Sequence, residues 1–152
     1  MPEPTEYELI TLIKRLAALL HQNIDAWLKP YDLARTQYVV LYNLHDTGRL
    51  PTGELLAKLQ VEAATLSGII DTLEAKGLAV RVEHAADKRR KDVQLTNAGQ
   101  KLLERIPPPG PVIERRLRRD IDPGDVHILR AVGQQMIRNL ETGLTRQERG
   151  QG

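Results

Sequence analysis

The chain has 152 residues and a mass of 17.1 kDa, which suits one compact unit with appended helices and is too short for two ordinary domains. Charged residues make up 28% of the sequence, the mean hydropathy is −0.38, and the first residues lack the pattern of a signal peptide, so we expect a cytoplasmic protein without membrane spans. The sequence contains no cysteine, which excludes disulfides, thiolate nucleophiles and cysteine-based zinc sites.

The basic residues are unevenly distributed, although the net charge is only +2. Between residues 76 and 91 there are two acids and six bases: Lys76, Arg81, Lys88, Arg89, Arg90 and Lys91. Composition alone favours a solvated surface as the explanation of such a cluster. The structural context of the cluster therefore decides whether it has a binding role.

Apolar periodicity predicts helices in the first half of the chain. Apolar residues recur every three or four positions from Tyr7 to Lys29, which predicts an amphipathic helix that Pro30 ends. A second helix is predicted with Thr36 as its N-cap residue and with an end near Gly48.

Two more helices follow this pair. Thr52 is expected to open a short third helix, and the segment from Gly48 to Glu54 is interpreted as a linker between helices. A fourth helix is predicted from Ala63 to Lys76, and Gly77 is expected to adopt the left-handed conformation that ends it.

Beyond Gly77 the apolar period changes from about 3.6 residues to about 2, which predicts two strands. Val80 and Val82 alternate with polar residues in the first strand, and Val93 and Leu95 do so in the second. The loop between the strands, residues 85–91, carries most of the basic cluster. The charge is therefore placed at the tip of a β-hairpin.

The C-terminal third is predicted to be helical with one interruption. Thr96 or Asn97 is expected to cap a helix that meets the run Pro107–Pro111, where consecutive prolines break or kink it. Helix then resumes around Pro111 and runs to about residue 120. The dipeptide Asp122-Pro123 predicts the start of a last helix, with a polar, frayed tail from Gly143.

Two short helices, a longer helix and a basic hairpin form the pattern of a winged helix-turn-helix, in a chain that is mainly α with a small β-hairpin wing. In this motif the helix after the turn enters the DNA major groove, and the hairpin reaches the neighbouring minor groove or the backbone. The motif thus directs the basic cluster toward phosphate, which makes a solvated surface the less favoured explanation.

Three segments carry a resemblance to a known family: DTLEAKGL at residues 71–78, DKR at 87–89 and VQLTNAG at 93–99. The sequence resembles the MarR-type (multiple antibiotic resistance) transcriptional regulators. The resemblance extends over 29 positions and includes both the residue types of the three segments and the two spacings between them. The resemblance implies a homodimer, formed by the N-terminal and C-terminal helices, that binds a pseudo-palindromic DNA operator. It also implies that a small aromatic acid often releases the DNA.

We therefore expect residues 1–152 to form a single unit in which residues 31–99 are the DNA-binding lobe. Residues 6–29 and 100–145 are expected to be dimerisation helices, because the apolar stripes of the first and last helices are wider than one small core can cover. The predicted function is a dimeric repressor that a small aromatic or phenolic ligand releases from DNA. The alternative is a winged-helix protein-interaction module that binds no operator.

The recognition helix offers few groups for reading bases. The residues expected on its groove face are Ala63, Ala64, Thr65, Ser67, Gly68 and Thr72. Thr65 and Ser67 can form hydrogen bonds and the alanines can pack on a thymine methyl group, but this segment has no side chain for a bidentate guanine contact. Sequence preference is then expected either to be modest or to depend on the wing and on DNA shape.

The wing residues expected at the DNA are Asp87, Lys88, Arg89, Arg90 and Lys91. Lys88, Arg90 and Lys91 are interpreted as phosphate contacts, and Asp87 as the residue that shapes the turn. Two roles remain open for Arg89. It enters the minor groove, forms an ion pair with Asp71 that braces the wing, as the resemblance also suggests, or does both.

Ligand and catalytic sites are weakly indicated. Arg15, at the edge of the first apolar stripe, is either solvated or captures a ligand carboxylate, and Trp27 either packs in a core or dimer interface or lines a ligand site. The four histidines lie far apart without metal-site spacing, and the sequence carries no nucleophile–histidine pair or dinucleotide fingerprint. We expect no enzyme activity, metal or cofactor.

Overall fold

A computed structural model describes residues 7–149, and the side chains of residues 7–144. The chain divides into two compact units, Met1–Pro109 and Gly110–Gly152. The first unit holds the whole winged helix together with the first helix, so the proposed dimerisation segments fall in both units. Within the described residues, no helix has the length and apolar character needed to cross a membrane.

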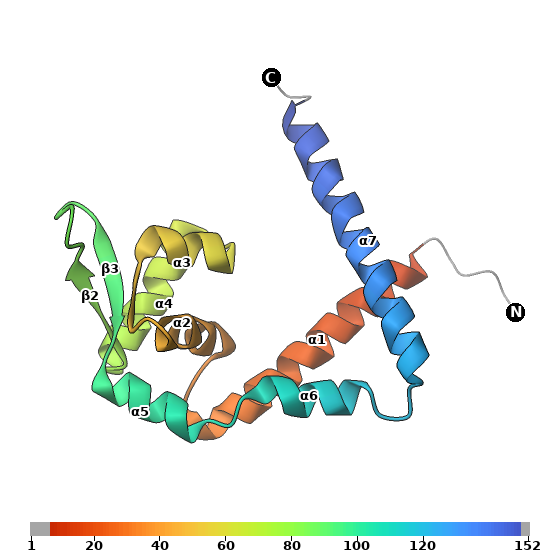
Figure 1. The fold of residues 1–152 in the computed structure, drawn as a ribbon, viewed down its shortest axis with the longest axis horizontal. Helices are drawn as coiled ribbons and strands as arrows, with labels where there is room; N and C mark the ends of the chain where they lie inside the picture. The colour runs from red at the N-terminus through yellow and green to blue at the C-terminus, as the bar shows by residue number, and fades with distance from the viewer. Residues whose placement is uncertain (1–6, 150–152) are drawn as a thin grey trace, which may run out of the picture. The chain divides into compact units, whose positions relative to one another are not determined.

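The first unit is helical with one small sheet (Figure 1). Its helices are α1 (Glu8–Leu28), the 3₁₀ turn η1 (Lys29–Tyr31), α2 (Arg35–His45), α3 (Thr52–Leu59), α4 (Ala63–Ala75) and α5 (Asn97–Arg105). Helix α1 ends just before Pro30, as predicted, and Pro30 itself lies inside η1. One predicted boundary needs correction, because Ala34 rather than Thr36 is the N-cap residue of α2. There the Gln37 side chain accepts a hydrogen bond from the Ala34 N–H at 3.2 Å and satisfies a donor at the helix start.

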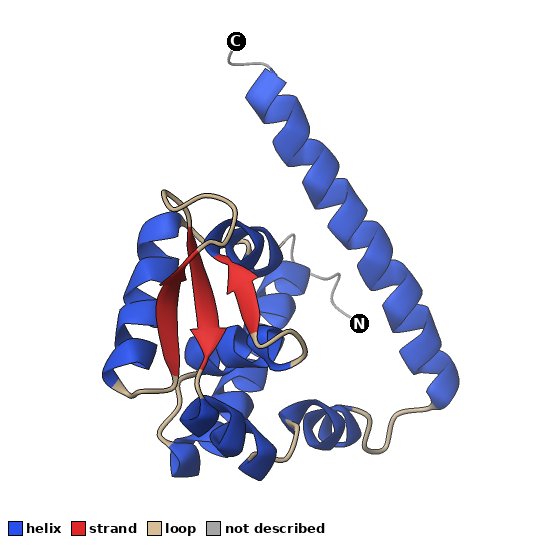
Figure 2. Cartoon of the chain, turned by 60° about the vertical axis from the view of Figure 1, so that its left-hand side comes forward, coloured by secondary structure: helices blue, strands red, loops and turns tan. Residues whose placement is uncertain are grey.

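The sheet has three strands, one more than the sequence predicts (Figure 2). The strands are β1 (Arg49–Pro51), β2 (Ala79–Glu83) and β3 (Lys91–Leu95), in the order β1-β3-β2, and both pairings are antiparallel. Strand β1 comes from the segment interpreted as a linker. Three residues are too few to show alternation, and Pro51, which lacks an N–H donor, is tolerated because β1 is an edge strand.

The core of the first unit fixes which face of α4 is left outside. Leu66, Ile70 and Leu73 recur every three or four residues along α4 and are at most 1% exposed. They belong to one apolar cluster with Leu41 and Leu44 of α2. Since one side of α4 is buried in this cluster, the opposite side faces solvent.

The predicted turn after α4 is confirmed. Gly77 has a φ of +68°, and the Leu78 N–H donates to the Leu73 carbonyl at 2.9 Å, which ends the helix and starts β2. Thr96 caps α5: its Oγ1 accepts from the Gly99 N–H at 3.0 Å and donates to the Gly77 carbonyl at 2.7 Å. A Cβ on Gly99 would lie 2.2 Å from the Leu78 carbonyl oxygen, so this close approach of backbones requires glycine.

The second unit contains most of α6 (Pro109–Leu117) and all of α7 (Pro123–Arg149). The proline run interrupts the helix as predicted, but helix resumes at Pro109 instead of Pro111. Asp122 precedes α7, and its Oδ1 accepts from the Gly124 N–H at 2.7 Å, in agreement with the predicted start. The prediction of a frayed tail from Gly143 is wrong, because α7 continues to Arg149 and most of the residues after Gly143 have good helix propensity.

Candidate nucleic-acid interface

The solvent-facing side of α4 carries all six residues that the sequence places on the groove face of the recognition helix. Ala63, Ala64, Thr65, Ser67, Gly68 and Thr72 are each exposed, opposite the buried stripe of the helix. Helix α3 and the turn before α4 complete the helix-turn-helix, and β2 follows α4 directly. In this arrangement the first unit exposes both one face of α4 and the wing hairpin to solvent.

Two of the three hydroxyl groups on this face already have partners in the protein. Thr72 Oγ1 donates to the Gly68 carbonyl one turn earlier at 3.0 Å, and Ser67 Oγ accepts from Arg81 Nη2 at 3.1 Å. Within the described part of the chain, Thr65 has no such hydrogen bond. Of the two residues expected to read bases, Thr65 is therefore the less constrained.

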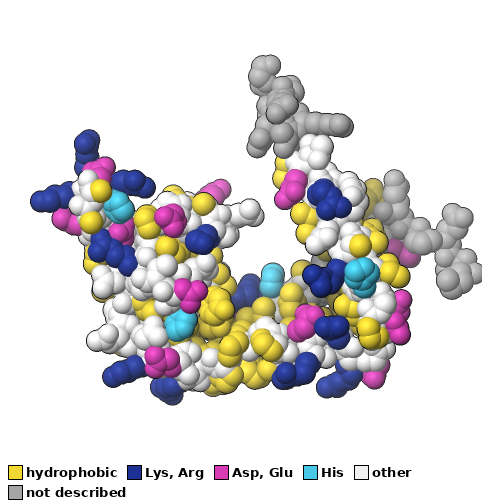
Figure 3. Space-filling view, viewed as in Figure 1, with side chains coloured by type: hydrophobic (Ala, Val, Ile, Leu, Met, Phe, Trp, Pro, Cys, Tyr) yellow, Lys and Arg dark blue, Asp and Glu magenta, His cyan; other side chains and the backbone are white. Residues whose placement is uncertain are grey.

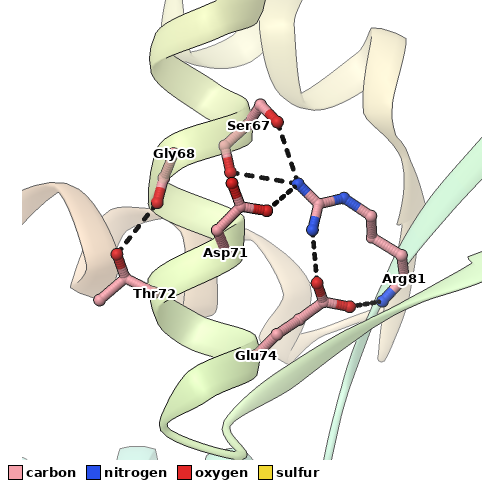
Figure 4. Close-up of polar contacts among 6 residues, drawn as sticks. All are labelled: Ser67, Gly68, Asp71, Thr72, Glu74 and Arg81. Carbon is pink, nitrogen blue, oxygen red and sulfur yellow. Dashed lines mark hydrogen bonds and ion pairs between the residues drawn. The ribbon is translucent and has the colours of Figure 1, made fainter.

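Arg81 of β2 holds α4 against the wing (Figure 4). Its Nη2 lies 2.7 Å from Asp71 Oδ1 and also donates to the Ser67 carbonyl at 3.1 Å, while its Nη1 pairs with Glu74. The Arg81 backbone N–H donates to Glu74 Oε1 at 2.7 Å. Burial disfavours the charge on Arg81, but the hydrogen bonds that Arg81 donates to Asp71 and Glu74 outweigh this effect and raise the pKa of the guanidinium.

The ion pair considered between Asp71 and Arg89 is absent, and that alternative is wrong. Asp71 does contact the wing, but through Arg81. The Arg89 side chain is 96% exposed, with its Nε 3.7 Å from Asp87 Oδ1. The reason is position along the hairpin: Arg81 lies in the strand that packs on α4, whereas Arg89 lies in the loop beyond it.

Asp87 shapes the loop of the wing. Its Oδ1 accepts from the Arg89 N–H at 3.0 Å and its carbonyl accepts from the Arg90 N–H at 2.9 Å, an Asx-type turn as predicted. Lys88, Arg89, Arg90 and Lys91 are exposed. Figure 3 shows the resulting group of cationic side chains at the end of the hairpin. The structure thus presents these charges to solvent and leaves them available for an anionic partner.

A buried carboxylate at the base of the wing was not predicted. Asp92 of β3 is 4% exposed; Arg49 Nε donates to its Oδ2 at 2.6 Å and His84 Nδ1 lies 2.7 Å from its Oδ1. Burial alone would raise the pKa of Asp92, but the hydrogen bonds from Arg49 and His84 lower it. No local sequence signal indicates this cluster, because Arg49 precedes Asp92 by 43 residues.

Neither of the two residues suggested for ligand binding lines either of the two cavities described below. Arg15 is exposed on α1, and Trp27 packs on the apolar cluster while its Nε1 donates to the Pro107 carbonyl at 2.9 Å. One cavity of about 490 Å³ has a mixed-charge lining that includes Asp25, Lys29 and Lys76. Another of about 230 Å³ is lined by Tyr38, Tyr42, His45, Leu103, Glu104, Ile106 and Pro108. Among the described residues, no group of three or more potential metal ligands converges.

Known proteins share both the sequence pattern and the fold. The MarR family model matches residues 33–91, which run from just before α2 to the start of β3. The crystal structure of the S. aureus MepR–DNA complex is 26% identical, covers 88% of this chain and 99% of that chain, and superposes with a TM-score of 0.79. Over residues 33–91 the chain is thus similar to the MarR family.

Two further MarR-family structures share the fold at lower identity. A mutant of MarR from E. coli in complex with operator DNA is 23% identical, covers 88% of this chain and 99% of that chain, and has a TM-score of 0.71. BpsR from Bordetella bronchiseptica, whose DNA binding is regulated by 6-hydroxynicotinic acid, is 23% identical, with a TM-score of 0.71 and coverage of 85% and 98%. The winged helix-turn-helix predicted from the sequence is thus confirmed as the fold.

Proposed function

We propose that this chain is a dimeric transcriptional regulator that binds a pseudo-palindromic DNA site. The observation that carries the proposal is the exposed basic loop, Lys88 to Lys91, in a unit that also exposes one face of α4. A protein-docking module has little use for four adjacent cations at the end of a hairpin, whereas a phosphate backbone is recognised by them. MepR, which shares the fold, was crystallised with DNA.

Each part of this surface has a distinct role in the proposal. Helix α4 enters the major groove with Thr65 at the base edges, and Lys88, Arg90 and Lys91 contact phosphates. Arg89, which has no close partner other than Asp87 among the described residues, enters the minor groove. Because α4 carries few base-reading groups, charge supplies most of the affinity and DNA shape contributes to the sequence preference.

Dimer formation is supported by exposed apolar side chains in each unit. In α1 these are Leu9, Ile10, Leu12, Ile13, Leu16 and Leu19, and in α7 they are Ile128, Leu129, Val132, Ile137, Leu140 and Leu144. Apolar patches of this extent mark interaction surfaces, because leaving them in water is unfavourable. Sedimentation should show a dimer at micromolar concentration, and a stable monomer would contradict this part of the proposal.

We also propose that a small aromatic acid weakens DNA binding. The cavity of about 230 Å³ beside α2 and α5 supports this idea, since Tyr38 and Tyr42 offer stacking surfaces and His45 offers a hydrogen-bonding group. Arg15 stays a candidate carboxylate anchor, although it lines neither of the two cavities described above. The ligand acts only if it prefers the conformation that does not bind DNA. Phenolic acids that stabilise the protein but leave its affinity for DNA unchanged would refute this role.

The deciding experiment is selection of bound sequences from a random pool of duplex DNA, followed by a salt titration on one selected and one random duplex. A regulator should enrich a palindromic site, and its affinity should fall steeply with salt. The alternative, a winged-helix protein-interaction module, is favoured by the small number of base-reading groups on the exposed face of α4. It predicts no enrichment and no steep salt dependence.

A further inference from the structure

The Asp92 carboxylate connects the segments from which the wing loop emerges. His84 directly follows β2 and Asp92 is the second residue of β3, so the pair of side chains closes the loop on both sides. A backbone hydrogen bond from the His84 N–H to the Arg90 carbonyl, at 3.1 Å, lies at the same level of the hairpin. The basic loop between these residues therefore starts from a defined base.

The second oxygen of the same carboxylate ties this base to the edge strand. Arg49 of β1 donates its Nε to Asp92 Oδ2 at 2.6 Å and its Nη2 to the Glu83 carbonyl at 2.5 Å. One guanidinium thus contacts both β2 and β3. Thr52, at the start of α3, adds a hydrogen bond from its Oγ1 to the Lys91 carbonyl at 2.7 Å. Isolated two-stranded ribbons are only marginally stable, so these contacts matter most where the hairpin leaves the body of the unit.

The geometry points to Asp92 as a positioning residue that sets the direction of the basic wing loop through Arg49 and His84. The Asp92 side chain is 5% exposed, so it acts through the hairpin and not by touching DNA. The effect on DNA rests on the proposed function, but the ordering of the loop does not.

The charge of Asp92 allows an experiment to distinguish a positioning role from a simple effect of net charge on DNA binding. Removing a carboxylate beside four cations should strengthen binding to phosphate if charge is all that matters. Glu83, at the end of β2, provides the matched control, because its side chain is exposed and the group that accepts from Arg49 is its carbonyl. Glu83→Gln and Asp92→Asn make the same change of charge on the same hairpin. Only Asp92→Asn puts an amide N–H, itself a donor, where the carboxylate accepted hydrogen bonds from Arg49 and His84.

The two variants should behave in opposite ways. Hydrogen exchange without DNA should be at least about tenfold faster for the wing amides, residues 84–91, in Asp92→Asn and unchanged in Glu83→Gln. On a random duplex, Asp92→Asn should weaken binding about tenfold, because the loop must be ordered on binding, whereas Glu83→Gln should tighten it about twofold. Unchanged wing exchange in a folded Asp92→Asn protein, or tighter DNA binding by both variants, would overturn the proposal.

A second pair of variants covers the case in which Asp92→Asn does not fold. His84→Asn keeps a side-chain N–H near the position of Nδ1, whereas His84→Leu removes it. Hydrogen exchange of the wing amides should be close to wild type in His84→Asn and faster in His84→Leu. Equal exchange rates in the two variants would contradict the role of the contact between His84 and Asp92. If wild-type protein does not bind duplex DNA but wing exchange follows these expectations, the positioning role stands and the proposed function fails.

Discussion

Replacing Lys88 and Arg90 by alanine tests the main source of DNA affinity in the proposed function. Both side chains are exposed at the end of the hairpin, and we expect each to neutralise one phosphate. Each lost contact flattens the slope of log K against log salt by about 0.9. The double variant should therefore lose about 1.8 units per wing, or about 3.6 for a dimer with both wings on one site.

This difference in slope is large enough to measure by fluorescence anisotropy on a labelled duplex. Between about 50 and about 200 mM salt, the affinity of the wild type should fall about 100-fold more than that of the variant. Lys101→Ala, which removes an exposed charge from α5, is the control and should leave the slope unchanged. An unchanged slope in the double variant would remove the wing from the phosphate interface and refute the account of affinity given above.

Four other predictions concern the recognition helix, the base of the wing and the start of α5. Thr65→Ala should change the selected DNA sequence more than the affinity for random duplex, because a hydroxyl reads a base edge without adding charge. Arg81→Ala should lower the free energy of unfolding by about 1–3 kcal/mol in urea titrations, since it leaves two carboxylates without their cation. Gly99→Ala should cost at least about 2 kcal/mol and lower Tm, because the new Cβ meets the Leu78 carbonyl. Since the pKa of Asp92 is lowered by folding, its contribution to stability is present above pH 3.8 and is lost as the pH falls through the lowered pKa. Acid unfolding followed by circular dichroism should show this component in the wild type but not in Asp92→Asn.

Several features of the fold were predictable because their causes lie within a few residues along the chain. The bounds of α4 follow from the spacing of Leu66, Ile70 and Leu73, and its end follows from Gly77, the residue that tolerates a positive φ. The place before a helical pattern leaves Thr96 and Asn97 as the two cap candidates, and the structure selects Thr96. The basic cluster could be assigned to a hairpin tip because the change of period on either side of it is also local.

Tertiary structure decided which distant groups meet. The sequence contains several arginines after Asp71. Their spacing along the chain does not show that Arg81, rather than Arg89, lies across from α4. Likewise, β1 exists because Leu50 pairs with Val93, a residue that only the folded chain brings beside it. Asp92 is held by Arg49 and His84 for the same reason. Periodicity and capping are properties of adjacent residues, whereas ion pairs and edge-strand pairing depend on how the packed core orients the elements that carry them.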